Sequence, residues 1–171
     1  ETVVFNNTFA DASVAVQLYS HCYGIIVDGN RSERTGGMHG FGWGGDFWGK
    51  NRKLFQLTMC CFNQFLNNDL SQGYVYQQGH SVGGVLGPCI NGFENAPPAV
   101  LGIGNVVRNN RLRDNNVAGS MGSHSLKIGA PHKEVGYNCR DTLLEGNTIA
   151  DTLGALAVDP FHRDTLLRNN R

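Results

Sequence analysis

A short phrase recurs along the chain: an aliphatic or β-branched run is followed by Asn or Gly and then by Asn. The copies are Val3-Val4-Phe5-Asn6-Asn7, Ile26-Val27-Asp28-Gly29-Asn30, Phe65-Leu66-Asn67-Asn68, Val106-Val107-Arg108-Asn109-Asn110, Leu143-Leu144-Glu145-Gly146-Asn147 and Leu166-Leu167-Arg168-Asn169-Asn170. The third copy is the loosest. Because extended apolar runs lie before and after each second Asn, the repeat predicts a stack of similar β coils with one Asn per coil.

The spacing of the copies supports this interpretation. The second Asn stands at positions 7, 30, 68, 110, 147 and 170, which gives separations of 23, 38, 42, 37 and 23 residues. Periods of roughly 20 to 50 residues are typical of solenoids. We interpret 23 residues as the basic unit and the longer separations as units with insertions. Runs such as Val14 to Leu18 and Gly154 to Val158 alternate with period two, which predicts strands.

Asparagine has a specific use at a fixed position of such a stack. Its amide can donate and accept hydrogen bonds along the stack axis. We therefore predict an internal ladder of Asn7, Asn30, Asn68, Asn110, Asn147 and Asn170. The alternative is that these are ordinary exposed turn residues, because Asn tolerates positive φ, but their recurrence at one repeat position favours the ladder.

The order of short strand, Asn turn, short strand, Gly-containing bend and longer strand resembles the right-handed parallel β-helix, or pectate-lyase-like, superfamily over most of the chain. The resemblance implies an all-β solenoid of three sheets and about six coils, in a single domain over residues 1–171. It also implies a groove on the first sheet that holds polysaccharide. First-sheet strands are then expected at Val14 to Leu18, Gly37 to Phe41, Gly73 to Gln77, Val117 to Met121 and Gly154 to Val158.

Composition and chain ends add further expectations. The formal net charge is zero, which gives no argument for binding nucleic acid or an acidic membrane, and no stretch is long and apolar enough for a membrane span. Five Cys without CxxC spacing favour buried thiols, with a disulfide such as Cys61 to Cys89 as the alternative. No capping segment is visible at either end, so we expect a piece of a longer solenoid or a chain that associates end to end.

Function is expected where the repeat is interrupted. Three insertions leave the coil at a similar point, after the expected first-sheet strand: Gly42 to Lys53, Gly79 to Gly102 and Gly122 to Asn138. Insertions at one phase of a solenoid emerge on one face, and loops on a rigid scaffold commonly carry binding and catalytic groups. We expect these three segments to line the groove.

The residues in and beside the insertions suit an acidic polysaccharide. Candidate catalytic acid or base groups are His39, Asp46, Lys50, His80, His124 and His132, and the histidines are included because imidazole titrates near neutral pH. Candidate substrate-binding residues are Trp43, Trp48, Arg52, Tyr74, Tyr76 and Lys133, whose rings would stack on sugars and whose cations would neutralise a uronate. The alternatives are that the two Trp form a small hydrophobic plug and that each His is an ordinary surface residue.

Other observations count against lyase or hydrolase chemistry. The outward stripe expected from the alternation is nearly uncharged and consists of Ala15, Gln17, Met38, Gly40, Tyr74, Tyr76, Ala118, Ser120, Ala155 and Ala157. Glycosidases require two carboxylates, and the insertions offer only Asp46, Glu94 and Glu134. No metal-ligand spacing is present, so no metal site is predicted, and calcium is the one cofactor that the resemblance implies.

Two hypotheses follow. The first is an extracellular or cell-surface carbohydrate-active protein, a polysaccharide lyase or glycoside hydrolase with polysaccharide as its partner. The second is a noncatalytic structural or adhesive β-helix, such as a fibre, surface or filament component. At this point the sequence leaves open whether the chain is an enzyme.

Overall fold

The computed structural model describes residues 2–12, 14–19, 22–41, 43–44, 57–58, 60–73, 84–87, 102–115, 124–128, 139–150, 156–158 and 162–171. Every regular element within these ranges is a β-strand, which agrees with the predicted all-β class. In this part of the chain no helix is long and apolar enough to cross a membrane.

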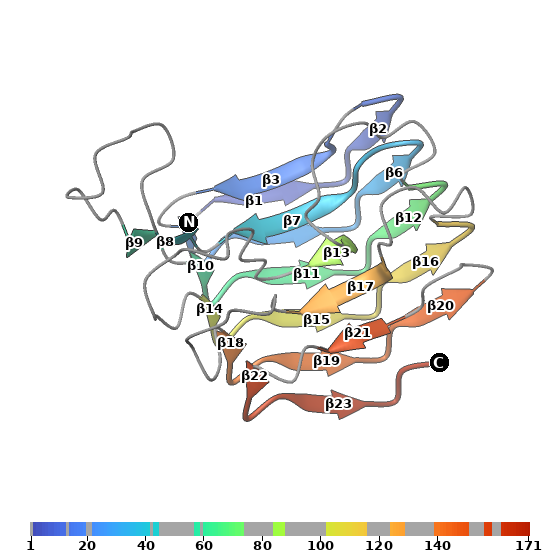
Figure 1. The fold of residues 1–171 in the computed structure, drawn as a ribbon. Coiled ribbons are helices and arrows are strands. Elements are labelled where there is room, and N and C mark those ends of the chain that lie inside the picture. The colour runs from blue at the N-terminus through green and yellow to red at the C-terminus, as the bar shows by residue number, and fades with distance from the viewer. Residues whose placement is uncertain are drawn as a thin grey trace.

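Three sheets of parallel strands make up most of the fold (Figure 1). The β1 sheet has six strands: β1 (Val3–Phe5), β5 (Ile26–Asp28), β11 (Gln64–Leu66), β15 (Val106–Arg108), β19 (Leu143–Glu145) and β23 (Leu166–Arg168). The β2 sheet has five: β2 (Thr8–Ala10), β6 (Arg31–Glu33), β12 (Asp69–Ser71), β16 (Arg111–Arg113) and β20 (Thr148–Ala150). The β3 sheet also has five: β3 (Val16–Tyr19), β7 (Met38–Phe41), β13 (Gly84–Gly87), β17 (His124–Ile128) and β21 (Leu156–Val158).

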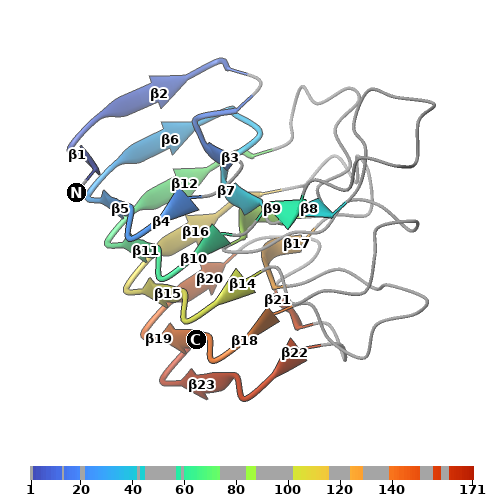
Figure 2. The same ribbon diagram turned by 90° about the vertical axis from the view of Figure 1, so that its left-hand side faces the viewer.

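Short two-residue strands lie between the β3 and β1 sheets along the chain. They are β4 (Cys22–Tyr23) paired with β10 (Cys60–Cys61), and the series β14 (Gly102–Ile103), β18 (Cys139–Arg140) and β22 (His162–Arg163). Figure 2 shows them stacked beside the β1 sheet. Among the strands that the structure describes, one pair is antiparallel: β8 (Trp43–Gly44) with β9 (Leu57–Thr58).

The chain visits these sheets repeatedly in the same order. From each strand of the β1 sheet it passes through the β2 sheet, the β3 sheet and a short strand before it returns to the β1 sheet. We call each such passage a circuit. Successive circuits stack in sequence order, from blue to red in Figure 1. This arrangement of parallel strands is compatible with a parallel β-helix.

Left-handed residues at the corners keep the strands short. One corner, directly before the ladder position, has positive φ at Asn6, Gly29, Asn67, Asn109, Gly146 and Asn169. A single left-handed residue costs an ordinary side chain about 1–2 kcal/mol, whereas Gly, Asn and Asp tolerate this conformation. The recurring Asn-Asn and Gly-Asn pairs are therefore the local cause of the turn between the β1 and β2 sheets.

Apolar side chains at the middle of the strands form the core. In the β1 sheet Val27, Phe65, Val107 and Leu144 are consecutive register partners, and each is fully buried. The β2 sheet contributes Leu70 and Leu112, and the β3 sheet contributes Val16, Met38 and Leu126. Complete burial of such a side chain stabilises the fold by about 1.5–3 kcal/mol.

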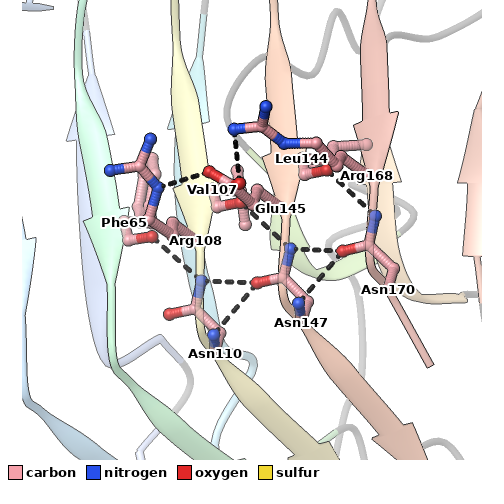
Figure 3. Close-up of polar contacts among 9 residues, drawn as sticks. All are labelled: Phe65, Val107, Arg108, Asn110, Leu144, Glu145, Asn147, Arg168 and Asn170. Atoms are coloured by element: carbon pink, nitrogen blue, oxygen red, sulfur yellow. Dashed lines mark hydrogen bonds and ion pairs between the residues drawn. The ribbon is translucent and has the colours of Figure 1, made fainter.

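The predicted asparagines form a continuous hydrogen-bonded ladder at the corner between the β1 and β2 sheets, and Figure 3 shows its last three members, Asn110, Asn147 and Asn170. The Oδ1 atom of each Asn accepts the backbone N–H and the side-chain Nδ2–H of the ladder Asn one circuit earlier, at 2.9–3.1 Å. From Asn30 onward, each Nδ2 also donates to a backbone carbonyl of the earlier circuit, as from Asn110 to Phe65 O at 2.9 Å, whereas Asn7 Nδ2 donates to Phe5 O of its own circuit at 3.0 Å. The ladder joins Asn7, Asn30, Asn68, Asn110, Asn147 and Asn170 in this order.

Two further polar columns were not predicted. Asn63 and Asn105 stand five residues before the ladder residues Asn68 and Asn110, are fully buried, and are joined by a hydrogen bond from Asn63 N to Asn105 Oδ1 at 3.0 Å. Asn115 stands five residues after Asn110, and its Oδ1 accepts Gly73 N–H at 2.8 Å. The repeated interval of five residues was the available sequence signal.

Two first-sheet strands lie elsewhere than expected. The strand between β7 and β17 is Gly84–Gly87 instead of Gly73 to Gln77, and the next is His124–Ile128 instead of Val117 to Met121. Residues 74–77 and 117–121 lie outside the described residues. Extra residues enter before these strands as well as after them, so the insertions proposed at 79–102 and 122–138 contain β13 and β17. Counting forward from the ladder Asn therefore misplaced the strands.

Candidate functional site

One row of register partners on the β3 sheet contains the exposed Gln17 and differs in part from the stripe that the alternation predicted. Gln17 is exposed and pairs in register with His39, which pairs with Gly87. Leu86 and Leu126 are register partners, so the residues that follow them, Gly87 and Lys127, are at the same register position. Lys127 in turn pairs with Ala157. The Gln17 row therefore consists of Gln17, His39, Gly87, Lys127 and Ala157.

The expected uncharged stripe is wrong at its second strand. Met38 was assigned to the outward face, but it is fully buried and pairs with Val16. The physical reason is a turn length: residues 34–37 connect β6 to β7, one residue fewer than residues 11–15 between β2 and β3. Because side chains alternate with period two, a shift of one residue exchanges the two faces. The row that contains exposed Gln17 thus includes two ionisable residues, His39 and Lys127.

The predicted histidines of the β3 sheet do not meet. His124 pairs with Gly84, two positions before the Leu86–Met38 pair, whereas His39 is one position after Met38. The two residues are three register positions and two strands apart, so their Cα atoms are separated by about 14 Å at the usual strand rise and spacing. His39 and His124 therefore belong to different positions along any ligand on this sheet.

Most other candidate site residues fall outside the described residues. Trp43 lies in β8, where its backbone pairs with Thr58. The remaining catalytic candidates Asp46, Lys50, His80 and His132 lie outside the described residues, as do the binding candidates Trp48, Arg52, Tyr74, Tyr76 and Lys133. They remain sequence predictions.

On the β1 sheet, charged side chains link neighbouring circuits (Figure 3). Glu145 accepts Arg108 Nε at 2.9 Å and Arg168 Nη2 at 2.5 Å, and these three residues are register partners on β15, β19 and β23. On the β2 sheet, Arg113 Nη2 lies 3.2 Å from Asp69 Oδ2. These charges contact one another, so their geometry supports the stack and does not point to a ligand.

An exposed ion pair links the first two corners after the β2 sheet. Arg34 donates to both carboxylate oxygens of Asp11, from Nε at 2.7 Å and from Nη2 at 2.8 Å, and it also contacts the Glu33 carboxylate. The hydrogen bonds from Arg34 lower the pKa of Asp11, and the same bonds raise the pKa of Arg34. The pair holds adjacent circuits together at a left-handed corner.

The cysteines that the structure describes with their side chains are thiols. Cys61 is buried and Cys22 is half-buried, in agreement with the expectation of buried thiols, and Cys22 pairs in register with Cys60. Cys89, the other residue of the alternative disulfide with Cys61, lies outside the described residues. Among the described side chains, no group of three His, Cys, Asp or Glu is arranged to hold a metal ion.

No protein-family model, curated protein or solved structure matches this chain. The resemblance to the pectate-lyase-like superfamily therefore depends on the repeat pattern and on the observed sheets and ladder.

Proposed function

We propose that the chain is a right-handed parallel β-helix of about six coils with a basic period of 23 residues, and that it binds an acidic polysaccharide along the β3 sheet. The separations of hydrogen-bonded ladder residues, 23 residues at each end of the stack and 37 to 42 between, support one coil per ladder Asn. An extracellular or cell-surface location follows from such a ligand.

The Gln17 row is the observation that carries this proposal. Its residues follow one another at the strand spacing of about 4.8 Å along the stack, so a linear polymer lying along the stack would pass Gln17, His39, Gly87 and Lys127 in turn. An amide, an imidazole and an ammonium group are donors suited to hydroxyls and carboxylates. Gly87 leaves room between His39 and Lys127 because it has no side chain.

The strands of the β3 sheet favour a lyase over a hydrolase. None of β3, β7, β13, β17 and β21 contains Asp or Glu, whereas a glycosidase needs two carboxylates. A lyase needs a base that takes the proton beside the uronate carboxyl group; the glycosidic C–O bond then breaks, a C=C bond forms, and the departing oxygen takes up a proton from water. His39 is the residue of the row whose ordinary pKa suits this step.

Binding and turnover can be tested separately on polygalacturonate, alginate and hyaluronan. We expect Lys127→Ala to weaken binding of the uronate polymer about tenfold, the effect of losing about 1.4 kcal/mol. Arg111→Ala is the matched control, because Arg111 is an exposed cation on the β2 sheet. Equal effects of the two variants, or equal binding of a neutral glucan, would contradict the proposed site.

The noncatalytic β-helix is the second candidate, and the continuous ladder of buried asparagines favours it because it makes a stiff stack without needing a reaction. Ultraviolet absorbance of unsaturated products distinguishes the two. Product formation that is lost in His39→Ala supports a lyase. Binding without any product supports a structural or adhesive protein that holds polysaccharide.

A further inference from the structure

The chain contains two tripeptides of the form that N-linked glycosylation requires, in which Asn is followed by any residue except Pro and then by Ser or Thr. They are Asn6-Asn7-Thr8 and Asn30-Arg31-Ser32. A glycan is bulky and needs a surface position. The first tripeptide begins one residue before a ladder Asn, whereas the second begins at a ladder Asn, so the fold gives the two tripeptides different surroundings.

Asn30 has no room for a glycan. It is 1 % exposed, and Ser32 is 2 % exposed. Asn30 Nδ2 donates to Val4 O at 2.8 Å and to Asn68 Oδ1 at 3.1 Å. Because a glycan replaces a hydrogen on this nitrogen, it would remove a donor and place a sugar at a buried position. A chain modified at Asn30 could not form this rung of the ladder.

Asn6 has the opposite surroundings. It is exposed at the left-handed corner between β1 and β2, with a φ of +54°, and its backbone N donates to Asp28 O at 3.1 Å, which fixes the corner to the next circuit. No hydrogen bond joins its side chain to another residue that the structure describes. Thr8, which supplies the hydroxyl of the tripeptide, is also exposed. Both side chains that define the tripeptide are therefore accessible to an enzyme.

The exposure of Asn6 is a property of the corner and does not depend on its place in the first circuit. Asn67 and Asn109 occupy the same corner with circuits on both sides, and both are exposed. They are followed two residues later by Asp69 and Arg111, so neither begins a glycosylation tripeptide. Asn67 and Asn109 are therefore controls that have the corner geometry without the motif.

We propose that Asn6 carries an N-linked glycan and that Asn30 does not. In this modification Asn6 Nδ2 forms a bond to the anomeric carbon of the first sugar of a lipid-pyrophosphate oligosaccharide. The bond from that carbon to the pyrophosphate oxygen breaks, the lipid pyrophosphate leaves, and the amide nitrogen gives up a proton. The inference rests on the proposed function in one respect, namely that the chain is extracellular and meets the enzymes that attach such glycans.

The corner that carries Asn6 lies away from the proposed polysaccharide site. It joins the β1 and β2 sheets, and Figure 2 shows this corner at the left of the stack and the strands of the β3 sheet to the right of it. A glycan on Asn6 and a polymer on the β3 sheet would therefore occupy different sides of the stack. We expect the glycan to leave polymer binding unchanged, so the two proposals can be tested independently.

The test uses the full chain, secreted through a signal peptide from animal cells that carry out N-linked glycosylation. Treatment with peptide N-glycosidase increases the electrophoretic mobility of a glycosylated chain and converts each modified Asn to Asp, which peptide mass spectrometry detects. We expect conversion at Asn6 in most secreted molecules and none at Asn30. Thr8→Ala should abolish the mobility change and Thr8→Ser should keep it. Asn67→Asp and Ser32→Ala are the matched controls and should leave it as it is.

The location of the modification decides the inference. A secreted chain that unfolds cooperatively but has no glycan on Asn6 would overturn it, and so would a glycan on Asn30 in that folded protein. A glycan on Asn6 that persists in Asn67→Asp and is lost in Thr8→Ala supports it. Failure of the polysaccharide proposal gives a different result, because the glycan would then be present on a chain that binds none of the uronate polymers.

Discussion

Replacing Asn110 by alanine removes the centre of the ladder. The Asn110 side chain accepts Asn68 N and Asn68 Nδ2 at 2.9 and 3.0 Å and donates to Phe65 O and Asn147 Oδ1 at 2.9 and 3.0 Å. It is 1 % exposed, so water does not reach these partners. In the variant, the buried N–H of Asn68 loses the acceptor seen here.

The expected cost follows from these contacts. A buried donor left without a partner costs about 1–3 kcal/mol, and each further hydrogen bond lost contributes about 1 kcal/mol. We therefore expect Asn110→Ala to lower the free energy of unfolding by about 3–5 kcal/mol. The matched control is Asn7→Ala, because Asn7 is exposed and Asn30 Oδ1 keeps the backbone N–H of residue 7 as a donor. For Asn7→Ala, the expected decrease in the free energy of unfolding is below about 1 kcal/mol.

Urea unfolding, followed by circular dichroism, measures the free energy of unfolding of both variants. Amide hydrogen exchange at Asn68 reports directly on the loss of the hydrogen bond from its backbone N–H. Exchange at this amide should accelerate in Asn110→Ala and stay unchanged in Asn7→Ala. If the two substitutions cost the same, or if Asn110→Ala costs less than about 1 kcal/mol, the reasoning that the buried ladder stabilises the stack is wrong.

Three further predictions concern the corners and the core. Gly104→Ala should lower stability more than Gly24→Ala: both have positive φ, but a Cβ at 104 meets an aromatic ring at 2.6 Å and one at 24 meets nothing within 4 Å. Calorimetric melting of the pair checks the difference, and equal losses would contradict it. The lowered pKa of Asp11 means that its stabilising contribution is present above the unfolded pKa of about 3.9 and is lost as the pH falls through the folded pKa. Arg34→Gln should abolish the loss of stability that protonation of Asp11 causes at low pH, as measured by melting temperatures over a range of pH. An unchanged dependence of the melting temperature on pH would argue against it. Leu112→Ala removes a fully buried side chain and should cost about 2–5 kcal/mol in urea unfolding, whereas a loss under about 1 kcal/mol would mean that this part of the stack collapses without a cavity.

The fold was largely predictable because its causes are local. A three-residue strand, a left-handed Asn or Gly and an inward Asn recur within five neighbouring residues, as at Val106 to Asn110. Each of these preferences can be recognised without knowing what packs against it. The same reasoning missed Asn63 and Asn105, whose fixed interval of five residues from the ladder was visible but was not used.

The site was less predictable because it depends on register. Period-two alternation predicts that a strand has two faces, but it does not predict which face is directed to the core. Met38 was assigned outward and is buried, since the turn before it is one residue shorter than the turn before Val16. His39 therefore pairs with Gln17. Lys127 belongs to the same row because this strand of the β3 sheet is His124–Ile128 and not Val117 to Met121, and Lys127 had not been a candidate at all.

The chain's own residue order was thus sufficient for the parallel all-β class and for the positions of the ladder asparagines, because turns and short strands arise from interactions between near neighbours in the sequence. Stacking of circuits was needed to bring Phe62 against Gly104 and to align His39 with Lys127, since these pairs are 42 and 88 positions apart in the sequence. Contacts over such separations follow from turn lengths and from packing against adjacent circuits, and neither is encoded in any single repeat.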